Sequence, residues 1–345
     1  MNLETITQTL HKQFGDPLVV LDSHTEGEPT RLIMGLSNIP GETINDKRMH
    51  MMHEMDHIRL LVTQEPRGHR DILAAAVTEP VTDGAAFGLI YMDARRYPYL
   101  CGHGTIGAVT TLIEAGVIKA QPPKTIITVD TPAGPMEATA DIEDGRVASV
   151  AISAVPCFAY LLDQPLDIPG VGKIQVDISF AGGFFAMVSQ GQIGLDLTVN
   201  NASKLASLGM AIIDAANEQI PVQHPTQPYI DTIDVAEFFD PSGHIQHRGR
   251  NVVIYGESHV DRSPCGTGTC AKMALLHKRG ELTVGEPFIN AGILGTTFEG
   301  QILSETRVAD YTAIIPQFKG RAYITGINRF FVDPDDPFPE GFLLQ

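Results

Sequence analysis

Basic residues, cysteines and long apolar runs are all scarce in this 345-residue sequence. Lysine and arginine together number 24 against 41 aspartates and glutamates, so the formal net charge is −17. Nucleic-acid phosphates bind to positively charged surfaces, so this balance argues against a nucleic-acid partner. No apolar run approaches the roughly 20 residues that span a bilayer, which argues against a membrane partner.

The amino terminus gives no sign of export. Its residues, MNLETITQTLHKQFGD, lack the basic-then-apolar order of a signal peptide. The four cysteines are too few and too scattered for a disulfide framework; they are Cys101, Cys157, Cys265 and Cys270. We therefore expect a cytoplasmic protein with reduced thiols.

The length of the chain favours two domains of roughly 150 residues each. No low-complexity linker separates them, so we expect the two domains to be closely coupled. Residues 3–14 place apolar side chains at helical spacing and predict a short amphipathic helix, and longer helices are predicted at 47–64 and 202–219. Strands are predicted at 17–21, 31–34, 87–92, 125–129, 147–152, 173–179, 251–255, 301–303 and 321–325.

An internal repeat is the strongest organisational signal. The chain reads Cys-Gly-His-Gly-Thr from Cys101 and Cys-Gly-Thr-Gly-Thr from Cys265, an offset of 164 residues. At this offset an Ile-Tyr pair precedes both motifs, and a glycine follows each cysteine by 15 residues, where a helix end needs a left-handed residue. Each copy predicts a strand, the cysteine motif, a helix and then two strands joined by a glycine-containing turn. Two such copies predict a pseudo-symmetric α/β protein with its site between the halves.

The position of each cysteine before a helix has chemical consequences. A helix N-terminus leaves backbone N–H groups unpaired and carries partial positive charge, so it binds anions and lowers the pKa of a cysteine placed there. The glycines of each motif leave these amides accessible to a carboxylate. Inversion of an amino acid at Cα needs a proton removed from one face and another delivered to the opposite face. Two thiols, Cys101 and Cys265, are suited to act as base and acid in turn.

Other roles for these residues are weaker. A zinc site formed by Cys101, His103, Cys265 and Cys270 does not match the usual ligand spacings, so no metal is expected. A phosphate loop is disfavoured because no Lys-Ser or Lys-Thr follows the glycines. Cys157 and Cys270 are most simply packing residues. A non-enzymatic amino-acid-binding protein is disfavoured because both motif cysteines are retained.

The motifs LCGHGTIG around Cys101 and DRSPCGTGT around Cys265 resemble the two signature segments of the proline racemase family. Further segments resemble that family in family order, and together they cover nearly the whole chain. They are DSHTEGEPTR (22–31), EPRGHRD (65–71), FGLIYMD (87–93), DISFAGGFFA (177–186), QHPT (223–226), AYITG (322–326) and the DPDDPFPEGFLL tail.

The resemblance implies an α/β (α+β) fold like that of diaminopimelate epimerase, in which each of two lobes wraps a mixed β-sheet or barrel around a central helix. It places 1–130 plus 326–345 in the lobe that carries Cys101, and 131–325 in the lobe that carries Cys265. It implies substrate contacts at Gly102 and His103 (through their backbone), Asp261, Gly266 and Thr267, and a further candidate contact at His224.

The family includes proline racemases, 4-hydroxyproline 2-epimerases and trans-3-hydroxyproline dehydratases. Dehydratases typically replace one cysteine, commonly the second by threonine, so retention of both cysteines disfavours dehydration. The run Phe180, Phe184 and Phe185 favours an apolar pocket for unsubstituted proline, although Gly183 stands where racemases often carry Ser or Asn. We expect reversible inversion of L-proline to D-proline, with epimerisation of trans-4-hydroxy-L-proline to cis-4-hydroxy-D-proline as the alternative.

The resemblance also bears on cofactors and partners. No cofactor is expected, and pyridoxal phosphate in particular is unsuited, because a ring secondary amine cannot give the neutral imine on which that cofactor acts. The expected partner is a small molecule, proline or hydroxyproline. A homodimer is common in such families.

Overall fold

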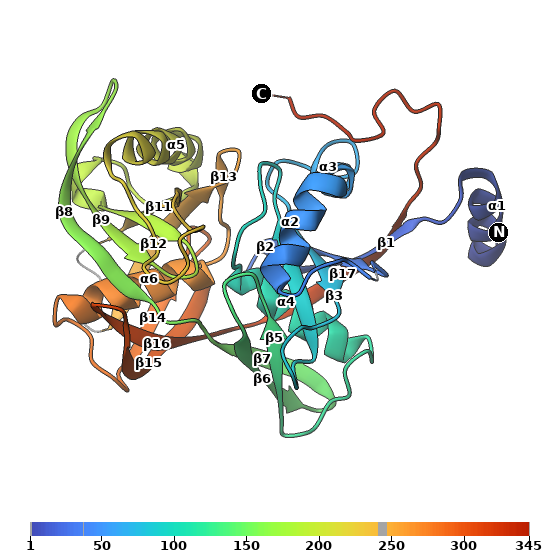
Figure 1. Ribbon diagram of the computed structural model, residues 1–345, viewed down its shortest axis with the longest axis horizontal. Helices are drawn as coiled ribbons and strands as arrows, with labels where there is room; N and C mark the ends of the chain where they lie inside the picture. Colours follow the sequence, from blue (N-terminus) through green and yellow to red (C-terminus); the bar gives the residue numbers. More distant parts are fainter. Residues whose placement is uncertain (1, 37, 241–246, 345) are drawn as a thin grey trace.

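The computed structural model describes residues 2–36, 38–240 and 247–344. The chain forms two α/β lobes that lie beside each other (Figure 1). Each lobe has one helix at its centre, with strands wrapped around it. The expected α/β architecture of two similar lobes is confirmed.

The first lobe is built around helix α4 (Gly102–Glu114). Side chains on all faces of this helix are buried from Gly102 to Ile113, as expected for a helix that strands surround. Helix α4 packs against strands β1, β2, β6, β7 and β17. The strands of this lobe are β1 (Leu18–Thr25), β2 (Glu28–Met34), β3 (Leu73–Thr78), β4 (Phe87–Met92), β5 (Lys124–Asp130), β6 (Met136–Glu143), β7 (Arg146–Ser153) and β17 (Ala322–Phe330).

The second lobe is built around helix α6 (Gly266–Lys278), which packs against strands β8, β9, β10, β15 and β16. Helix α5 (Ala202–Gln219) covers the outer side of the sheet, over β11 and β12. The remaining strands are β8 (Phe158–Ile168), β9 (Gly172–Phe180), β10 (Phe184–Ser189), β11 (Ile233–Phe239), β12 (Arg248–Tyr255), β13 (His259–Val260), β14 (Pro287–Ala291), β15 (Thr297–Val308) and β16 (Tyr311–Gly320). Two short 3-10 turns are η1 (Gln190–Gln192) and η2 (Val199–Asn201).

The predicted repeat is present in the structure. Helices α4 and α6 each have 13 residues and begin directly after a motif cysteine. Gly116 and Gly280 follow the two helices in the left-handed conformation, with φ of 74° and 75°. Each helix is followed by an antiparallel pair joined by a turn, β5 with β6 and β14 with β15.

The two lobes share backbone and core. Strand β16 of the second lobe pairs with β7 of the first through Gln317–Gly320, and β17 then pairs with β1. One buried apolar cluster contains side chains of both central helices, so the lobes are not separately packed units. Strands β6 and β7 follow residue 130 in the chain, and they contact α4, the central helix of the first lobe. The lobe limits expected at residues 130 and 325 stay a prediction.

The helices partly differ from those predicted. Helices α1 (Leu3–Phe14) and α5 match the expected ranges 3–14 and 202–219. The helix expected at 47–64 is instead two helices, α2 (Ile44–Glu54) and α3 (Asp56–Thr63), separated at Met55. Helix α2 starts earlier than expected because Thr43 and Asp46 form a reciprocal capping box. Among the described helices, none combines the length and apolar character needed to cross a membrane.

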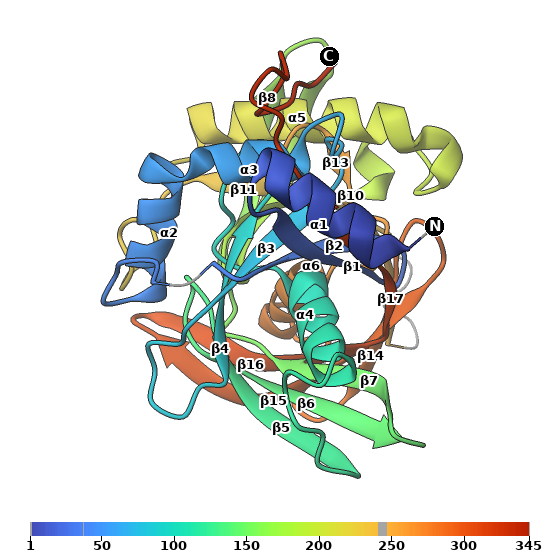
Figure 2. The same cartoon turned by 90° about the vertical axis from the view of Figure 1, so that its right-hand side faces the viewer.

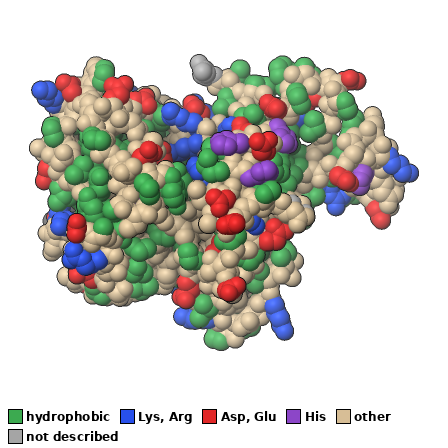
Figure 3. All heavy atoms as spheres, in the orientation of Figure 1, with side chains coloured by type: hydrophobic (Ala, Val, Ile, Leu, Met, Phe, Trp, Pro, Cys, Tyr) green, Lys and Arg blue, Asp and Glu red, His purple; other side chains and the backbone are tan. Residues whose placement is uncertain are grey.

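The first lobe is extended by the amino-terminal helix α1, which has no buried residue and projects from the body in Figure 1, so that in Figure 2 it lies in front of the other elements. On the face seen in Figure 3, acidic and basic side chains are interspersed, and histidines gather over α2 and α3. This face therefore presents no continuous basic surface to phosphates.

The packing of α5 on β12 gives a first prediction. A Cβ added at Gly209 would lie 2.6 Å from Cβ of Ile254, which overpacks this contact. Gly209→Ala should therefore destabilise the protein by about 1 to 3 kcal/mol, although Gly→Ala in an unhindered helix stabilises by up to about 1 kcal/mol. Urea unfolding measures the change, and Ser207→Ala, on the exposed side of α5, should alter stability by less than about 0.5 kcal/mol. A stabilised Gly209→Ala variant contradicts the packing.

Candidate active site

A pocket opens between the two lobes, and both lobes contribute to its wall. It contains about 580 Å³ of space, part of which is open solvent. Six of the predicted site residues line it together: Cys101, Gly102, His103, Asp261, Cys265 and Thr267. Residues 164 positions apart in the chain therefore meet at one site, as the repeat predicts.

The N-terminal ends of helices α4 and α6 meet at the base of this site. A Cβ built on Gly102 would lie 2.9 Å from Cα of Gly266 and 2.6 Å from the Phe318 ring. A Cβ built on Gly266 would meet the same ring at 2.5 Å. Only glycine fits at either position, because any side chain would separate the helix ends. The predicted residue Gly266 therefore holds the helix ends in contact.

Cys101 occupies the N-cap of α4 with extended backbone geometry. Its side chain is buried, and Sγ lies 3.3 Å from Nδ1 of His103. Burial lowers the pKa of His103 to about 4, so this imidazole is neutral at neutral pH. The resemblance implied only a backbone contact for His103. The structure shows that its ring also contacts Sγ of Cys101.

Cys265 occupies the N-cap of α6 in a different conformation. Its φ is 57°, a left-handed value that is unfavourable for a residue with a Cβ and is commonly found at functional sites. Hydrogen bonds hold Cys265 in this conformation. Its N–H donates to Oγ of Ser263 at 3.0 Å, and its Sγ accepts from the N–H of Gly268 at 3.2 Å. The hydroxyl of Thr267 lies 3.5 Å from the same sulfur.

The thiols do not have the lowered pKa that the helix ends alone predict. Burial raises the pKa of Cys101, and the N–H of Gly104 opposes that effect without reversing it. Burial and then the Asp261 carboxylate raise the pKa of Cys265, against the smaller lowering by Thr267 and Gly268. The expectation of lowered pKa values is corrected: desolvation of both sulfurs outweighs the hydrogen bonds that they accept from the helix amides.

Asp261 is the main charged group beside the two sulfurs. Its Oδ1 accepts from the N–H and the hydroxyl of Ser263 at 2.8 and 2.7 Å, and its Oδ2 is buried with no hydrogen-bond partner among the described residues. Burial, followed by the nearby Glu28 carboxyl, raises the pKa of Asp261 to about 6. At neutral pH this carboxylate is therefore charged and has one oxygen available for a cationic ligand.

A buried pair behind Asp261 was not predicted. Oε1 of Glu28 lies 2.5 Å from Nε2 of His259, and both side chains are fully buried. Burial raises the pKa of Glu28 to about 8 and lowers that of His259 to about 4, so a neutral acid and a neutral imidazole are favoured at pH 7. The His259 ring stacks on Tyr255, a pocket residue, at 4.3 Å between centroids. Only the segment DSHTEGEPTR contained a signal for Glu28.

Three residues that were expected near the substrate do not line the pocket. The ring of His224 packs 4.4 Å from that of Phe180, and His224 is not part of the pocket wall, so its role as a substrate contact stays a prediction. Of the three phenylalanines expected around the ligand, only Phe185 lines the pocket. Phe180 and Phe184 instead pack in the core of the second lobe.

The remaining cysteines lie away from the pocket wall. Cys157 and Cys270 are fully buried in the shared core, as expected for packing residues. Among the described residues, no group of three or more His, Cys, Asp or Glu side chains is arranged to hold a metal ion. Cys270 is therefore not grouped with Cys101, His103 and Cys265 as the zinc alternative requires.

Comparisons with known proteins agree on one family. The family model described as proline racemase matches residues 20–343. The chain is 44% identical to a proline racemase of Clostridioides difficile, over 96% of this chain and all of that one. It is 41% identical to a 4-hydroxyproline 2-epimerase of Streptosporangium roseum, over 94% and 97% of the two chains. The crystal structure of a hydroxyproline epimerase from Agrobacterium vitis with bound trans-4-hydroxy-L-proline matches with a TM-score of 0.91 and 31% identity, over 96% of each chain.

The charge of Asp261 yields a prediction for the thiols. Because this carboxylate raises the pKa of both Cys101 and Cys265, Asp261→Asn should lower both pKa values. At pH 8, above the pKa of about 6 for Asp261 itself, both thiols should react with iodoacetamide about threefold faster or more. Peptide mass spectrometry across pH 7 to 10 measures each rate. Asp310→Asn, at an exposed turn, is the control, and unchanged rates in Asp261→Asn contradict the assignment.

Proposed function

Because the chain belongs to the proline racemase family and is an isomerase, we propose that it inverts Cα of proline without a cofactor, using Cys101 and Cys265 as acid and base. The observation that supports this proposal most directly is that both sulfurs line one pocket, each at the N-terminus of its own helix. Two proton-transfer groups that reach one small ligand satisfy the central requirement of a two-base inversion.

The helix ends bind the substrate carboxylate in this proposal. The first-turn amides of α4 and α6 have no helical carbonyl to bind, and the two glycines bring these ends into contact. Backbone N–H groups of Gly102 and His103 on one side, and of Gly266 and Thr267 on the other, would donate to the carboxylate oxygens. Negative charge grows on these oxygens as Cα loses its proton, so the same donors stabilise the carbanion.

The ring ammonium is assigned to Asp261. Its buried Oδ2, which has no hydrogen-bond partner among the described residues, supplies an acceptor for the substrate N–H. The positive ammonium also compensates the charge that raises the pKa of both thiols.

The proton transfers balance in either direction. With Cys101 as thiolate and Cys265 as thiol, the Cα proton moves to the first sulfur and the second sulfur delivers its proton to the opposite face. After the two proton transfers, Cys101 is the thiol and Cys265 is the thiolate. Exchange with water restores the starting form. The neutral His103 ring, 3.3 Å from Sγ of Cys101, is placed to assist that exchange.

Proline is favoured over 4-hydroxyproline by the rest of the wall. Leu100, Phe185, Val235 and Val253 supply apolar surface. Two polar groups of the wall are already paired: Arg96 with Asp234, and the Tyr99 hydroxyl as donor to the carbonyl of Tyr229 at 3.0 Å. A ring hydroxyl buried without a partner is unfavourable by about 1 to 3 kcal/mol. The cytoplasmic location and the homodimer expected from the sequence stay predictions.

Replacement of either cysteine tests the two-base scheme. Cys101→Ser and Cys265→Ser should each lower racemisation of L-proline by about 100-fold to 10,000-fold, because a hydroxyl is a far weaker acid and base partner here than a thiol. Polarimetry measures the rate. Cys270→Ala, a change in the same helix but outside the pocket, should retain activity. Full turnover by either serine variant refutes the scheme.

A substrate panel in heavy water tests the choice of ligand. L-proline should exchange its Cα proton with a kcat/KM about tenfold or more above that of trans-4-hydroxy-L-proline, and trans-3-hydroxy-L-proline should not be dehydrated. Proton NMR follows all three. Early in the reaction the deuterium should appear in D-proline while the remaining L-proline keeps its proton. A preference for the 4-hydroxy substrate would instead favour epimerisation.

A further inference from the structure

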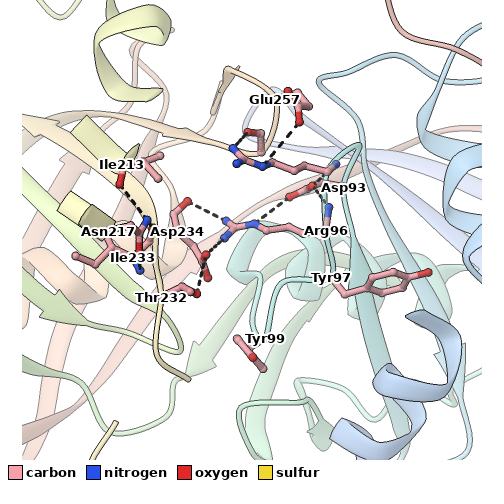
Figure 4. Close-up of polar contacts among 12 residues, drawn as sticks. Asp93, Arg96, Tyr97, Tyr99, Ile213, Asn217, Thr232, Ile233, Asp234 and Glu257 are labelled. Atoms are coloured by element: carbon pink, nitrogen blue, oxygen red, sulfur yellow. Dashed lines mark hydrogen bonds and ion pairs between the residues drawn. The ribbon is translucent and has the colours of Figure 1, made fainter. Parts of the chain in front are cut away.

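Arg96 links the two lobes at the wall of the pocket (Figure 4). It belongs to the segment between β4 and Cys101, whereas its partner Asp234 belongs to β11 of the second lobe. Nη1 of Arg96 lies 2.5 Å from Oδ1 of Asp234, and Nη2 donates to the carbonyl of the same residue at 3.0 Å. The guanidinium therefore holds both the side chain and the backbone of one residue.

The first lobe fixes the backbone of Arg96. The carboxylate of Asp93, which is 1% exposed, accepts from the N–H groups of Arg95 and Arg96 at 2.8 and 2.9 Å. The N–H of Asp93 donates in return to the carbonyl of Arg96 at 2.9 Å. Oδ2 of Asp93 also lies 3.7 Å from Nε of Arg96. This tight turn fixes the direction in which Arg96 leaves the first lobe.

The second lobe fixes Asp234 to a similar degree. The adjacent Ile233 exchanges two hydrogen bonds with the side chain of Asn217 in α5, at 2.9 and 2.7 Å. The Asn217 amide also donates to the carbonyl of Ile213, and the hydroxyl of Thr232 donates to Oδ1 of Asp234 at 3.1 Å. The start of β11 is therefore anchored to α5, and Asp234 is presented at a defined position (Figure 4).

The neighbouring Arg95 provides a comparison within the same turn. It also reaches the second lobe, but its Nη1 donates to the carbonyl of Gly256 at a long 3.4 Å, its Nε lies 3.8 Å from Glu257, and its side chain is 46% exposed. The side chains of Arg96 and Asp234 are only 22% and 24% exposed. An exposed pair at such a distance contributes little, whereas a half-buried charge-assisted contact with good geometry is stronger.

We propose that Arg96 and Asp234 are positioning residues that hold the segment carrying Cys101 against the second lobe, so that both sulfurs face the same ligand. Arg96 is five residues before Cys101, and Pro98, Tyr99 and Leu100 of the intervening segment line the pocket. Separation of the pair leaves two charges partly buried without their partners, which favours the closed arrangement. Opening of this contact exposes the pocket and its thiols.

Thiol accessibility tests the proposal without a substrate. Arg96→Gln should raise the rate at which iodoacetamide modifies Cys101 and Cys265 about tenfold, as the pocket opens. Loss of a positive charge alone raises a thiol pKa and slows this reaction. A faster modification rate therefore indicates that the pocket has opened, whereas a slower rate indicates only the change in charge. Cys157 and Cys270, which are fully buried in the core, report global unfolding in the same peptide maps. They should remain unmodified.

A mutant cycle tests whether the two residues act as a pair. Asp234→Asn should give a similar increase, and the double variant should not exceed the larger single effect by more than about twofold, because either change removes the same contact. Arg96→Lys, which keeps the charge but not the paired geometry, should fall between the wild type and Arg96→Gln. Arg95→Gln is the matched control and should change the rates less than about twofold.

Kinetics with L-proline provide a second measurement, which rests on the proposed function. Arg96→Gln should raise KM about tenfold and lower kcat less than about threefold, because saturating substrate closes the pocket at the expense of affinity. If the protein does not act on proline, the kinetic measurement fails, but the alkylation rates still test the role of Arg96 and Asp234. The proposal is overturned by unchanged or slower modification of Cys101 and Cys265 in Arg96→Gln. It is also overturned by an increase matched at Cys157 and Cys270, or by additive effects in the double variant.

Discussion

The contact between two helix N-termini is the constraint on which the site depends. Gly102 and Gly266 touch each other beneath the Phe318 ring, and neither position has space for a Cβ. This contact places the cysteine that precedes each helix at one pocket. It also explains why both halves keep a glycine directly after the cysteine, while the third motif residue is free to differ between His103 and Thr267.

Burial of this contact has an electrostatic consequence. Desolvation raises the pKa of both thiols, lowers that of His103 and raises that of Asp261 to about 6, so at neutral pH the Asp261 carboxylate is the main charge in the free site. The helix amides of Gly104 and Gly268 lower the pKa of the nearby sulfurs but do not reverse this effect. A zwitterionic ligand brings one positive and one negative group, and each meets a complementary element of the site.

Sequence patterns predicted local elements far better than contacts between the lobes. Helix α5, strand β4 and the left-handed glycine after each central helix follow from periodicity and from repetition at one offset. The pairs Arg96–Asp234 and Glu28–His259 join residues more than 130 positions apart and have no local pattern. The break at Met55, whose φ of −131° lies outside the helical range, has no signal in the apolar spacing. The Phe180–Phe185 run failed as a pocket prediction because alternate side chains of a strand point to opposite faces.

The two halves are repeated in architecture but unequal in detail. Cys101 has extended backbone and a neutral histidine beside its sulfur, whereas Cys265 has a left-handed backbone and a helix amide bound to its sulfur. L- and D-proline have equal free energies in water, so the equilibrium constant for their interconversion is one. For the proposed racemisation, the ratio of kcat/KM in the two directions must equal that constant, whatever the difference between the sulfurs. In the proposed racemisation of proline, the asymmetry can therefore change kcat and KM in each direction but not the ratio of the two kcat/KM values, so the reaction would stay fully reversible.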